Sequence, residues 1–458
     1  MSPDATTRRA DAARARSLQD AAVFHLQNLL RCDTQSPPGN ERIAAEYIAG
    51  ALADEGIDAE ILESAPGRAS VVARLRAENP AARPVLLMGH IDVVTVERDK
   101  WERDPFGGEL IEGYVWGRGA VDMKGQVAAE LAAFIALKRA GVALTRDVIF
   151  VAFADEEAGG AFGADWVWKN HQDLIDAEFA INEGGGTPID IGEKLFYTCQ
   201  VGEKGGARLK MTVRGEPGHA SVPQANTAME KLGEAMKRLH AWEPPTVLTT
   251  SIRHFLEGVG EALDGATNDA IKALLAQGSP SWTELAKLPL PETEKAHFRA
   301  ITRNTAVPTI IHGGKQINVI PSEVIVEIDG RILPGADPED FRAAVQEAVG
   351  DVAEITFLYD TQESGIEADP ASSFFEAIKA TMAALQPDAT VVPSLISGGT
   401  DAGLVPGIKV YGFFPILPTE RVPLYDTLVH GHNERVHVDD IGFGTRFIYD
   451  LVVRVCGG

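Results

Sequence analysis

Five short segments of this sequence carry histidine or acidic residues that could bind metal. The first three are Gly89-His90-Ile91-Asp92, the 117–125 segment around Asp122, and Asp155-Glu156-Glu157. Glu183 stands before three glycines, and His430 lies in the 429–435 segment. Imidazole and carboxylate groups without a cysteine thiolate suit zinc, manganese or cobalt in a catalytic role. These segments therefore indicate metal-dependent chemistry.

The number of acidic residues in these segments narrows that chemistry. If four carboxylates shared one crevice, they would repel one another unless some were protonated or cations neutralised them. Two divalent ions that share one carboxylate would solve this problem, lower the pKa of a water between them toward about 7, and stabilise a tetrahedral oxyanion. A carboxylate that is not a ligand must still take the proton from that water. The residues therefore predict a two-metal hydrolase with an acidic general base.

The elements that would position these residues are strands of an α/β sheet. Apolar strands are predicted over 85–88, 148–154 and 178–182, and each runs directly into one of the segments. A helix is predicted over 125–140, just after Asp122. Strands that alternate with helices predict a mostly parallel sheet sandwiched by helices. Because the carboxyl ends of such strands line the functional crevice, these side chains would converge if the strands are neighbours.

Each segment also has an ordinary structural explanation when it is taken alone. A lone His-x-Asp such as His90-Ile91-Asp92 is more often a hydrogen-bonded loop, and Asp-Glu-Glu is typical of a solvated turn. His430 could be a surface residue, and Glu183 could simply lie at the edge of a loop. The combination of all of them at strand ends, in one order, favours a functional site.

The composition limits the size, partners and location of the protein. The chain has 458 residues and a net charge of −24, so two domains are expected, and nucleic acid and membrane surfaces are poor partners. Its 3 cysteines are far apart in sequence, which predicts no disulfide framework and a reducing, cytoplasmic location. We find no secretory h-region and no apolar run that could span a bilayer.

The order of predicted elements changes after residue 205. Alternating strands and helices with a mixed β and α order predict a small antiparallel sheet with helices on one face, inserted into the first domain. The α/β pattern returns near residue 370. The predicted domains are a metal-binding catalytic domain in two parts, 1–206 and 366–458, and an inserted domain over 207–365.

In this order the segments resemble the zinc-dependent aminoacylases and exopeptidases. That family includes aminoacylase, carboxypeptidase S, glutamate carboxypeptidase, succinyl-diaminopimelate desuccinylase and acetylornithine deacetylase. The resemblance extends over nearly the whole chain and includes four later segments, Gly218–Pro223, Asn318–Pro321, Asp329-Gly330-Arg331 and Ser397–Asp401. It implies a zinc exopeptidase-like catalytic domain and a ferredoxin-like inserted domain that serves as a lid and can form a homodimer.

The resemblance implies that five residues bind two divalent ions, zinc by expectation, with cobalt or manganese as alternatives. His90 and Glu183 would hold one ion. Glu157 and His430 would hold the other. Asp122 would bridge the two ions.

Two further acidic residues are implied to act beside these ligands. Glu156 would be the general base, and Asp92 would orient His90 from outside the ligand set. The family also implies a cis peptide bond between Asp122 and Met123.

The residues implied to contact the substrate come from later segments. Arg331 would pair with the substrate carboxylate, for which a planar guanidinium is better suited than an ammonium group. Asn318 would bind the substrate, and Gly398 and Gly399 would line its pocket. His219 would stabilise the oxyanion, and in dimeric relatives this histidine reaches the site of the partner subunit. Taken alone, Arg331 could form an exposed ion pair and His219 could be a turn residue.

The predicted activity is hydrolysis of the amide bond of an N-acyl amino acid or short peptide near a free carboxylate. Within the family, glutamate at position 183 favours deacylases and carboxypeptidases over dipeptidases, which remain the alternative with the same core. A binding protein that had lost catalysis would be expected to lack ligands or the base, and a two-metal phosphatase fits Arg331 poorly. The long 241–303 segment is predicted to elaborate the lid, with hinges near Gly205 and residue 365.

Overall fold

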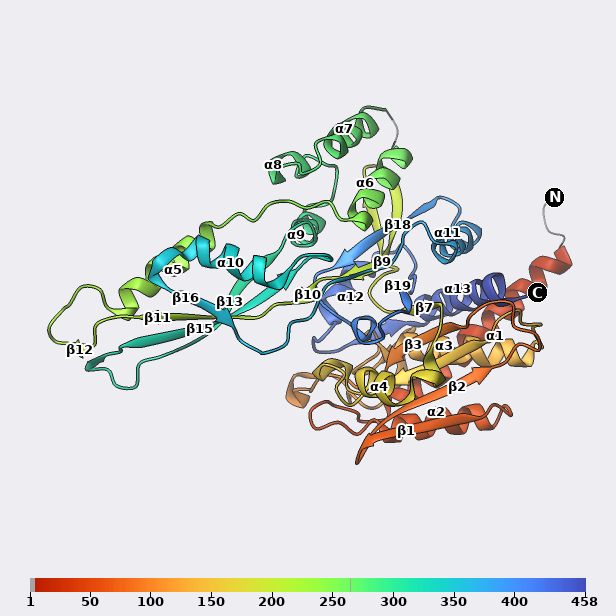
Figure 1. Ribbon diagram of the computed structural model, residues 1–458. Coiled ribbons are helices and arrows are strands. Elements are labelled where there is room, and N and C mark those ends of the chain that lie inside the picture. The colour runs from red at the N-terminus through yellow and green to blue at the C-terminus, as the bar shows by residue number, and fades with distance from the viewer. Residues whose placement is uncertain (1–4, 264) are drawn as a thin grey trace. The chain divides into compact units, whose positions relative to one another are not determined.

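The computed structural model describes residues 5–263 and 265–458, and the chain forms two compact units (Figure 1). The first unit extends to Val201 and also contains Ala368–Ser394 and Thr400–Gly458. The second unit comprises Gly202–Glu367 and Leu395–Gly399. The last of these segments, which was predicted with the catalytic domain, joins the second unit beside Lys204, whose backbone N–H donates to the carbonyl of Ile396.

A mixed sheet forms the centre of the first unit, and its four central strands are parallel. In spatial order they are β6 (Val148–Phe153), β3 (Val85–His90), β7 (Phe179–Asn182) and β19 (Lys409–Gly412). Antiparallel strands β1 (Ala59–Ala65) and β2 (Arg68–Leu75) extend one edge, and β9 (Lys194–Glu203) joins β19 at the other. β8 (Pro188–Ile191) and β18 (Ala389–Ile396) pair with β9. The predicted α/β class with a mostly parallel central sheet is confirmed.

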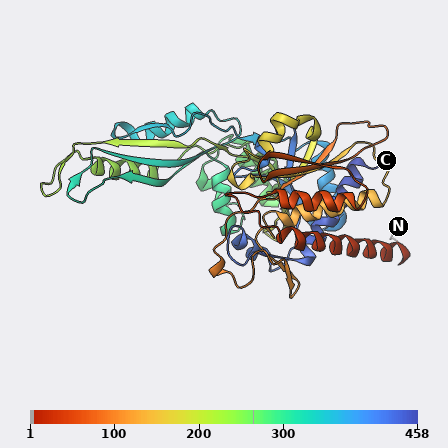
Figure 2. The same cartoon turned by 90° about the horizontal axis from the view of Figure 1, so that it is seen from below.

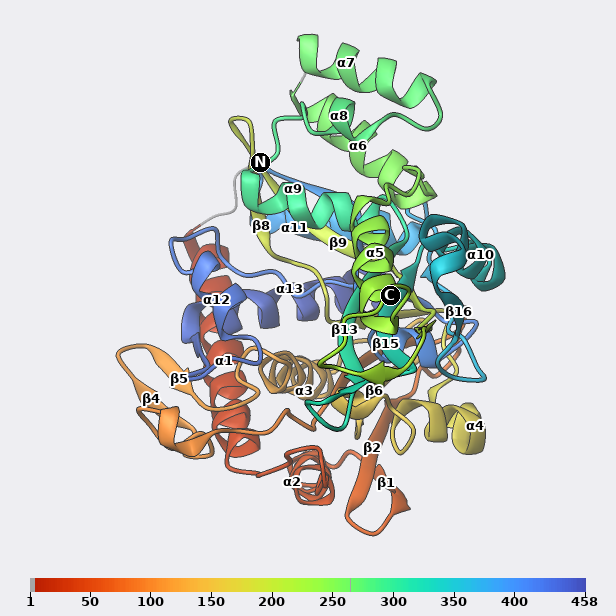
Figure 3. The ribbon, with the colours of Figure 1, turned by 90° about the vertical axis from the view of Figure 1, so that its left-hand side faces the viewer.

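Helices cover both faces of this sheet, because its central strands are apolar throughout. Every residue of β3 and β6 is buried, as expected of parallel strands that are covered on both sides. α1 (Ala5–Leu30), α3 (Lys124–Arg139) and α13 (Val438–Cys456) pack against one another, and α11 (Ser373–Leu385) packs against α13. Figure 3 shows α2 (Arg42–Ala53) and α4 (Ala164–Ile175) on opposite sides of β1 and β2.

A small three-stranded sheet lies outside the central one and joins two distant parts of the sequence. Its strands are β4 (Glu109–Ile111), β5 (Tyr114–Trp116) and β20 (Arg435–His437). β5 pairs antiparallel with β20, so that Trp116 lies opposite Arg435. The segment that contains Asp122 therefore begins beside the point where the segment that contains His430 ends.

The second unit contains an antiparallel sheet with α5 (Ala228–Ala241) and α10 (Pro338–Val349) packed against it (Figure 2). Its long strands are β11 (Leu209–Arg214), β13 (Thr305–Gly313) and β15 (Glu323–Ile332). Short strands β10 (Gly205–Gly206) and β16 (Glu354–Phe357) complete it. Alternate residues of β15 are buried, which is the pattern of a sheet with one covered face.

The 241–303 segment is mainly helical and belongs to the second unit. It contains α6 (Thr250–Leu263), α7 (Gly265–Ala276), α8 (Trp282–Leu285) and α9 (Glu292–Ile301). None of the helices in the described residues combines the length and apolar character that a membrane span requires.

Candidate active site

The parallel register of β3, β6 and β7 places three of the predicted site segments at one sheet edge. His90 is the last residue of β3, and Glu183 directly follows β7. Glu156 and Glu157 lie in a short 3-10 turn just after β6. Because neighbouring parallel strands end at the same edge, these four side chains come from adjacent positions.

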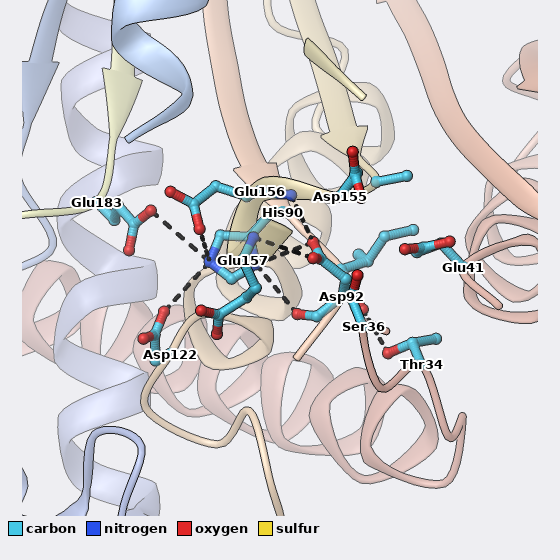
Figure 4. Close-up of polar contacts among 12 residues, drawn as sticks. Thr34, Ser36, Glu41, His90, Asp92, Asp122, Asp155, Glu156, Glu157 and Glu183 are labelled. Carbon is cyan, nitrogen blue, oxygen red and sulfur yellow. Dashed lines mark hydrogen bonds and ion pairs between the residues drawn. The ribbon is translucent and has the colours of Figure 1, made fainter. Parts of the chain in front are cut away.

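The first group of possible metal ligands comprises His90, Asp122 and Glu183 (Figure 4). The Nε2 atom of His90 lies 3.2 Å from Oδ1 of Asp122 and 3.7 Å from Oε1 of Glu183. Asp122 reaches the group from the loop before α3, and its peptide bond to Met123 is cis, as the resemblance implies. The side chain of His90 is only 1% exposed, so this group is built largely inside the protein.

The second group comprises Asp122, Glu157 and His430. The Nε2 atom of His430 lies 3.2 Å from the other oxygen of Asp122, Oδ2, and 3.1 Å from Oε2 of Glu157. Asp122 thus presents one carboxylate oxygen to each group. The structure brings all five predicted ligands together, with a shared carboxylate between two pairs.

Glu156 lies beside the first group without belonging to either one in the described residues. Its Oε2 atom is 3.9 Å from Nε2 of His90, and Figure 4 shows its carboxylate turned toward that ring. This placement leaves its carboxylate available for proton transfer.

Asp92 connects the histidine to the acidic turn. Its two carboxylate oxygens accept hydrogen bonds from the backbone N–H groups of Glu156, at 3.0 Å, and Glu157, at 3.1 Å. Oδ1 of Asp92 also lies 3.5 Å from Nδ1 of His90, and the side chain is fully buried. One carboxylate therefore contacts both the imidazole ring and the turn that carries Glu156 and Glu157.

The proton affinities of the cluster reflect its density of negative charge. Burial and, after it, the neighbouring Asp122 carboxylate raise the pKa of Glu157 to about 7. Burial also raises the pKa of Glu183 well above its usual range. The hydrogen bond to Asp122 raises the pKa of His430 to about 9. Without cations, protons must compensate the carboxylates, so the donor set fits a pair of divalent ions that would replace those protons.

A buried arginine, Arg68 on β2, contacts Asp155, the residue just before the turn that carries Glu156 and Glu157. Its guanidinium donates to both oxygens of Glu41, each at 2.8 Å, and also to Asp155. Asp155 has a φ of 69°, a left-handed conformation that is uncommon for a residue other than glycine. Oδ2 of Asp155 accepts from the N–H of Phe162 at 2.9 Å, so its conformation is held from two sides. The sequence analysis did not identify this role for Arg68, because nothing in the sequence links residues 41, 68 and 155.

Lys124, the first residue of α3, connects the Asp122 loop to α1. It is fully buried, and its Nζ atom donates to the carbonyls of Leu29, at 3.1 Å, and Cys32, at 2.8 Å. Burial lowers the pKa of Lys124 to about 8. The loop of Asp122 is therefore tied to the C-terminal end of α1.

Two residues predicted to contact substrate lie together in the second unit. His219 in β12 (Gly218–His219) pairs with Val319 in β14 (Val319–Ile320), and the N–H of Ala220 donates to the carbonyl of Asn318 at 3.0 Å. His219 is exposed, and its Nδ1 accepts from the backbone N–H of Ser221 at 3.2 Å. In the neutral ring the proton must then be on Nε2, where it can be donated.

Arg331 lies elsewhere in the second unit, near the end of β15. Its Nε atom is 3.2 Å from both oxygens of Asp329, and its side chain is 22% exposed. Gly398 and Gly399 lie in the loop after β18, with Gly399 exposed. Within this unit the structure brings His219 and Asn318 together but does not bring Arg331 to them.

The fold is similar to that of solved peptidases. A metallo-carboxypeptidase of the M20 family from Sulfolobus solfataricus matches with a TM-score of 0.67 and 20% identity, over 94% of this chain and 98% of that chain. A dinuclear metal-binding peptidase of the M20 family from Bacillus subtilis matches with a TM-score of 0.61 and 15% identity, over 96% of this chain and 99% of that chain. At these identities the likeness concerns the fold.

The sequence comparisons establish the class and the family. A Dictyostelium discoideum protein described as "Probable carboxypeptidase S-like 2" is 28% identical over 393 residues, which are 84% of this chain and 74% of the relative. Aminoacylase-1 of Mus musculus is 27% identical over 426 residues, 91% of each chain. The model of peptidase family M20/M25/M40 matches residues 86–454. The protein is a metal-dependent hydrolase. It belongs to peptidase family M20/M25/M40, which confirms the resemblance inferred from its motifs.

Proposed function

We propose that the protein uses two divalent metal ions, zinc in the first instance, to hydrolyse the amide bond of an N-acyl amino acid or short peptide near a free carboxylate. The single observation that carries this proposal is the position of Asp122, whose two oxygens face separate groups of ligands. A shared carboxylate of this kind is suited to hold two cations close together.

Proton transfer is assigned to Glu156. When bound, two divalent ions would lower the pKa of a water between them and polarise the scissile carbonyl. Glu156 takes one proton as the water oxygen attacks the carbonyl carbon, and it delivers that proton to the nitrogen as the C–N bond breaks. Burial raises the pKa of Glu156, which favours a group that must accept a proton and release it again.

Several residues of the second unit are assigned to the substrate. The Nε2–H group of His219 would donate to the developing oxyanion. Arg331 would bind the substrate carboxylate with its terminal nitrogens, while Asp329 holds its Nε. Asn318 and the Gly398-Gly399 loop would contact the rest of the substrate, and we expect this unit to close over the metal ions.

The geometry of β15 favours a homodimer in which each site uses residues of both chains. His219 pairs with Val319, before the start of β15 at Glu323, whereas Arg331 is near its end. Figure 1 shows β12 at one tip of the second unit and β10 at the other end of the sheet. Eight residues of strand span about 26 Å, so the two side chains of one chain cannot contact the same small substrate. The second chain would supply the missing residue.

The unpaired outer edge of β13 is a candidate surface for this dimer. In the described residues β13 pairs only with β15, and it exposes the apolar side chains of Val307, Ile310 and Ile311. An edge strand of this kind can pair with a copy of itself. Sedimentation velocity would show a dimer, and a monomer with full activity would contradict the shared site.

A dipeptidase with the same core is the alternative. The discriminating experiment loads the protein with Zn²⁺, Co²⁺ or Mn²⁺ and compares N-acetyl amino acids with free dipeptides of the same C-terminal residue. We expect cleavage of the N-acetylated substrates. Cleavage restricted to substrates with a free amino group would replace the deacylase proposal with the dipeptidase, and no cleavage of any amide would contradict both.

A further inference from the structure

A buried ion pair, Arg118 with Glu434, lies between the two loops that carry Asp122 and His430. Arg118 is 2% exposed and Glu434 is fully buried. The Nη1 atom of Arg118 donates to Oε2 of Glu434 at 2.8 Å. The residues are distant in sequence, and the pair adds a side-chain connection to the backbone pairing of β5 with β20 that joins the same two segments.

Glu434 organises the backbone that leads to the shared ligand. Its Oε2 atom also accepts from the N–H of Gly119 at 2.9 Å, and its Oε1 atom accepts from the N–H groups of Val121 at 2.8 Å and Asp122 at 3.1 Å. Four donors thus converge on one buried carboxylate. Three of them are backbone groups in the loop of the shared ligand, so Glu434 fixes the path of that loop.

Arg118 also contacts the loop that carries His430, through the second terminal nitrogen of its guanidinium. Its Nη2 atom donates to the carbonyl of Gly431 at 2.7 Å and lies 3.4 Å from the carbonyl of His430. His430 has a φ of 57° and Asn433 a φ of 61°, so this short loop contains two left-handed residues that are not glycine. Such backbone persists only where surrounding contacts hold it.

The two ligand histidines differ in what else holds them. His90 is 1% exposed and is held through Asp92, whereas the side chain of His430 is 54% exposed. An exposed imidazole has few packing contacts, so its position depends on the position of its backbone. That backbone is fixed by Arg118.

We propose that the Arg118–Glu434 pair is a positioning device that sets the separation of Asp122 and His430 before metal binds, and thereby sets the affinity of the Asp122–Glu157–His430 site. The pair contacts no substrate and donates no ligand. Because the loops are already in place, metal binding does not have to order them, and the second ion binds more tightly. This inference rests on the proposed two-metal function.

The test is a titration of the metal-stripped, full-length protein with Co²⁺, followed by calorimetry and by the visible spectrum of the bound ion. In Arg118→Lys the ammonium group keeps the charge but cannot bridge Glu434 and Gly431 as a planar fork does. We expect the first ion to bind as in the wild type and the second about 10- to 100-fold more weakly. Excess Co²⁺ should restore kcat with an unchanged KM, which a damaged fold would not allow.

Arg74→Lys is the matched control. Arg74 donates to Asp147 at 2.8 Å from the other end of the sheet, where it lies opposite Ile149 in β6. This substitution makes the same chemical change in another arginine–carboxylate pair, and it should leave both Co²⁺ affinities unaltered.

Glu434→Asp provides a second variant, since the shorter side chain cannot reach all four donors. Equal weakening of both ions in Arg118→Lys, or no weakening of either, would overturn the inference. Failure of both variants to fold would do so too, because the pair would then be a requirement of the fold. If the wild type itself bound fewer than two ions, the proposed two-metal function would fail instead.

Discussion

The two groups of residues that form the proposed metal site are built in different ways. The His90–Asp122–Glu183 group takes two of its ligands from the ends of neighbouring buried strands. The Asp122–Glu157–His430 group depends on a half-exposed histidine in a loop close to the C-terminal helix. The first group is positioned by the sheet itself, whereas the second must be positioned by hydrogen bonds between loops. We therefore expect the two groups to respond differently to substitution.

Glu156→Gln should have the largest effect on activity, because Glu156 belongs to neither ligand group. We expect kcat to fall by about 10²- to 10⁴-fold while both ions stay bound. Steady-state assays combined with elemental analysis of the dialysed protein provide the measurement. Glu109→Gln, an exposed glutamate on β4, is the control and should behave as the wild type. If Glu156→Gln retained activity, Glu156 would not be the general base.

Asp122→Asn should weaken both groups together, because each uses one oxygen of this carboxylate. Substitutions outside the ligand set commonly weaken metal binding by 10- to 100-fold, so we expect the loss at a shared ligand to exceed about 100-fold for each ion. Calorimetric titration with Zn²⁺ measures both affinities. Loss of one ion with the other unaffected would show that Asp122 does not bridge.

His90→Ala and His430→Ala separate the two groups. We expect His430→Ala to lower the free energy of unfolding of the metal-free protein by about 1 kcal/mol or less, because its side chain is half-exposed and solvent screens its ion pairs with Asp122 and Glu157. His90→Ala should lower it by about 1–3 kcal/mol, because it removes a fully buried side chain and its contacts with Asp92 and Asp122. Chemical denaturation in a chelator measures both values. Equal losses would contradict the structural difference between the groups.

The smallest expected signal is the release of protons when metal binds. At pH 7 Glu157 is partly protonated with a pKa of about 7, and His430 is largely protonated with a pKa of about 9. A ligand must lose its proton before it coordinates, so binding should release at least about one proton per chain, and affinity should rise with pH through this range. Calorimetry in buffers of different ionisation enthalpy measures the release. Heats that are independent of the buffer would contradict it.

Much of the first ligand group could be predicted from the sequence. His90 is the last residue of β3 and Glu183 directly follows β7, and the parallel order of these strands dictates that their ends meet. The prediction of the second group depended more on the family resemblance, because the position of His430 is set by contacts within a loop. Nothing in residues 429–435 shows that Arg118 holds their carbonyls.

Strand β13 was not predicted from the sequence, and the reason is physical. β13 contains Pro308 and has an irregular register between Pro308 and Ile310, and proline is a signal against a central strand. The strand is at an edge of its sheet, where proline is tolerated. The separation of His219 from Arg331 was also unpredictable, because it depends on which end of β15 each residue occupies.

Anomalous diffraction from crystals of the protein loaded with Zn²⁺ tests the central claim most directly. We expect two peaks, each about 2.0–2.2 Å from a different oxygen of Asp122, with His90 beside one and His430 beside the other. A single peak, or two peaks away from Asp122, would contradict the proposal that this carboxylate joins two metal ions.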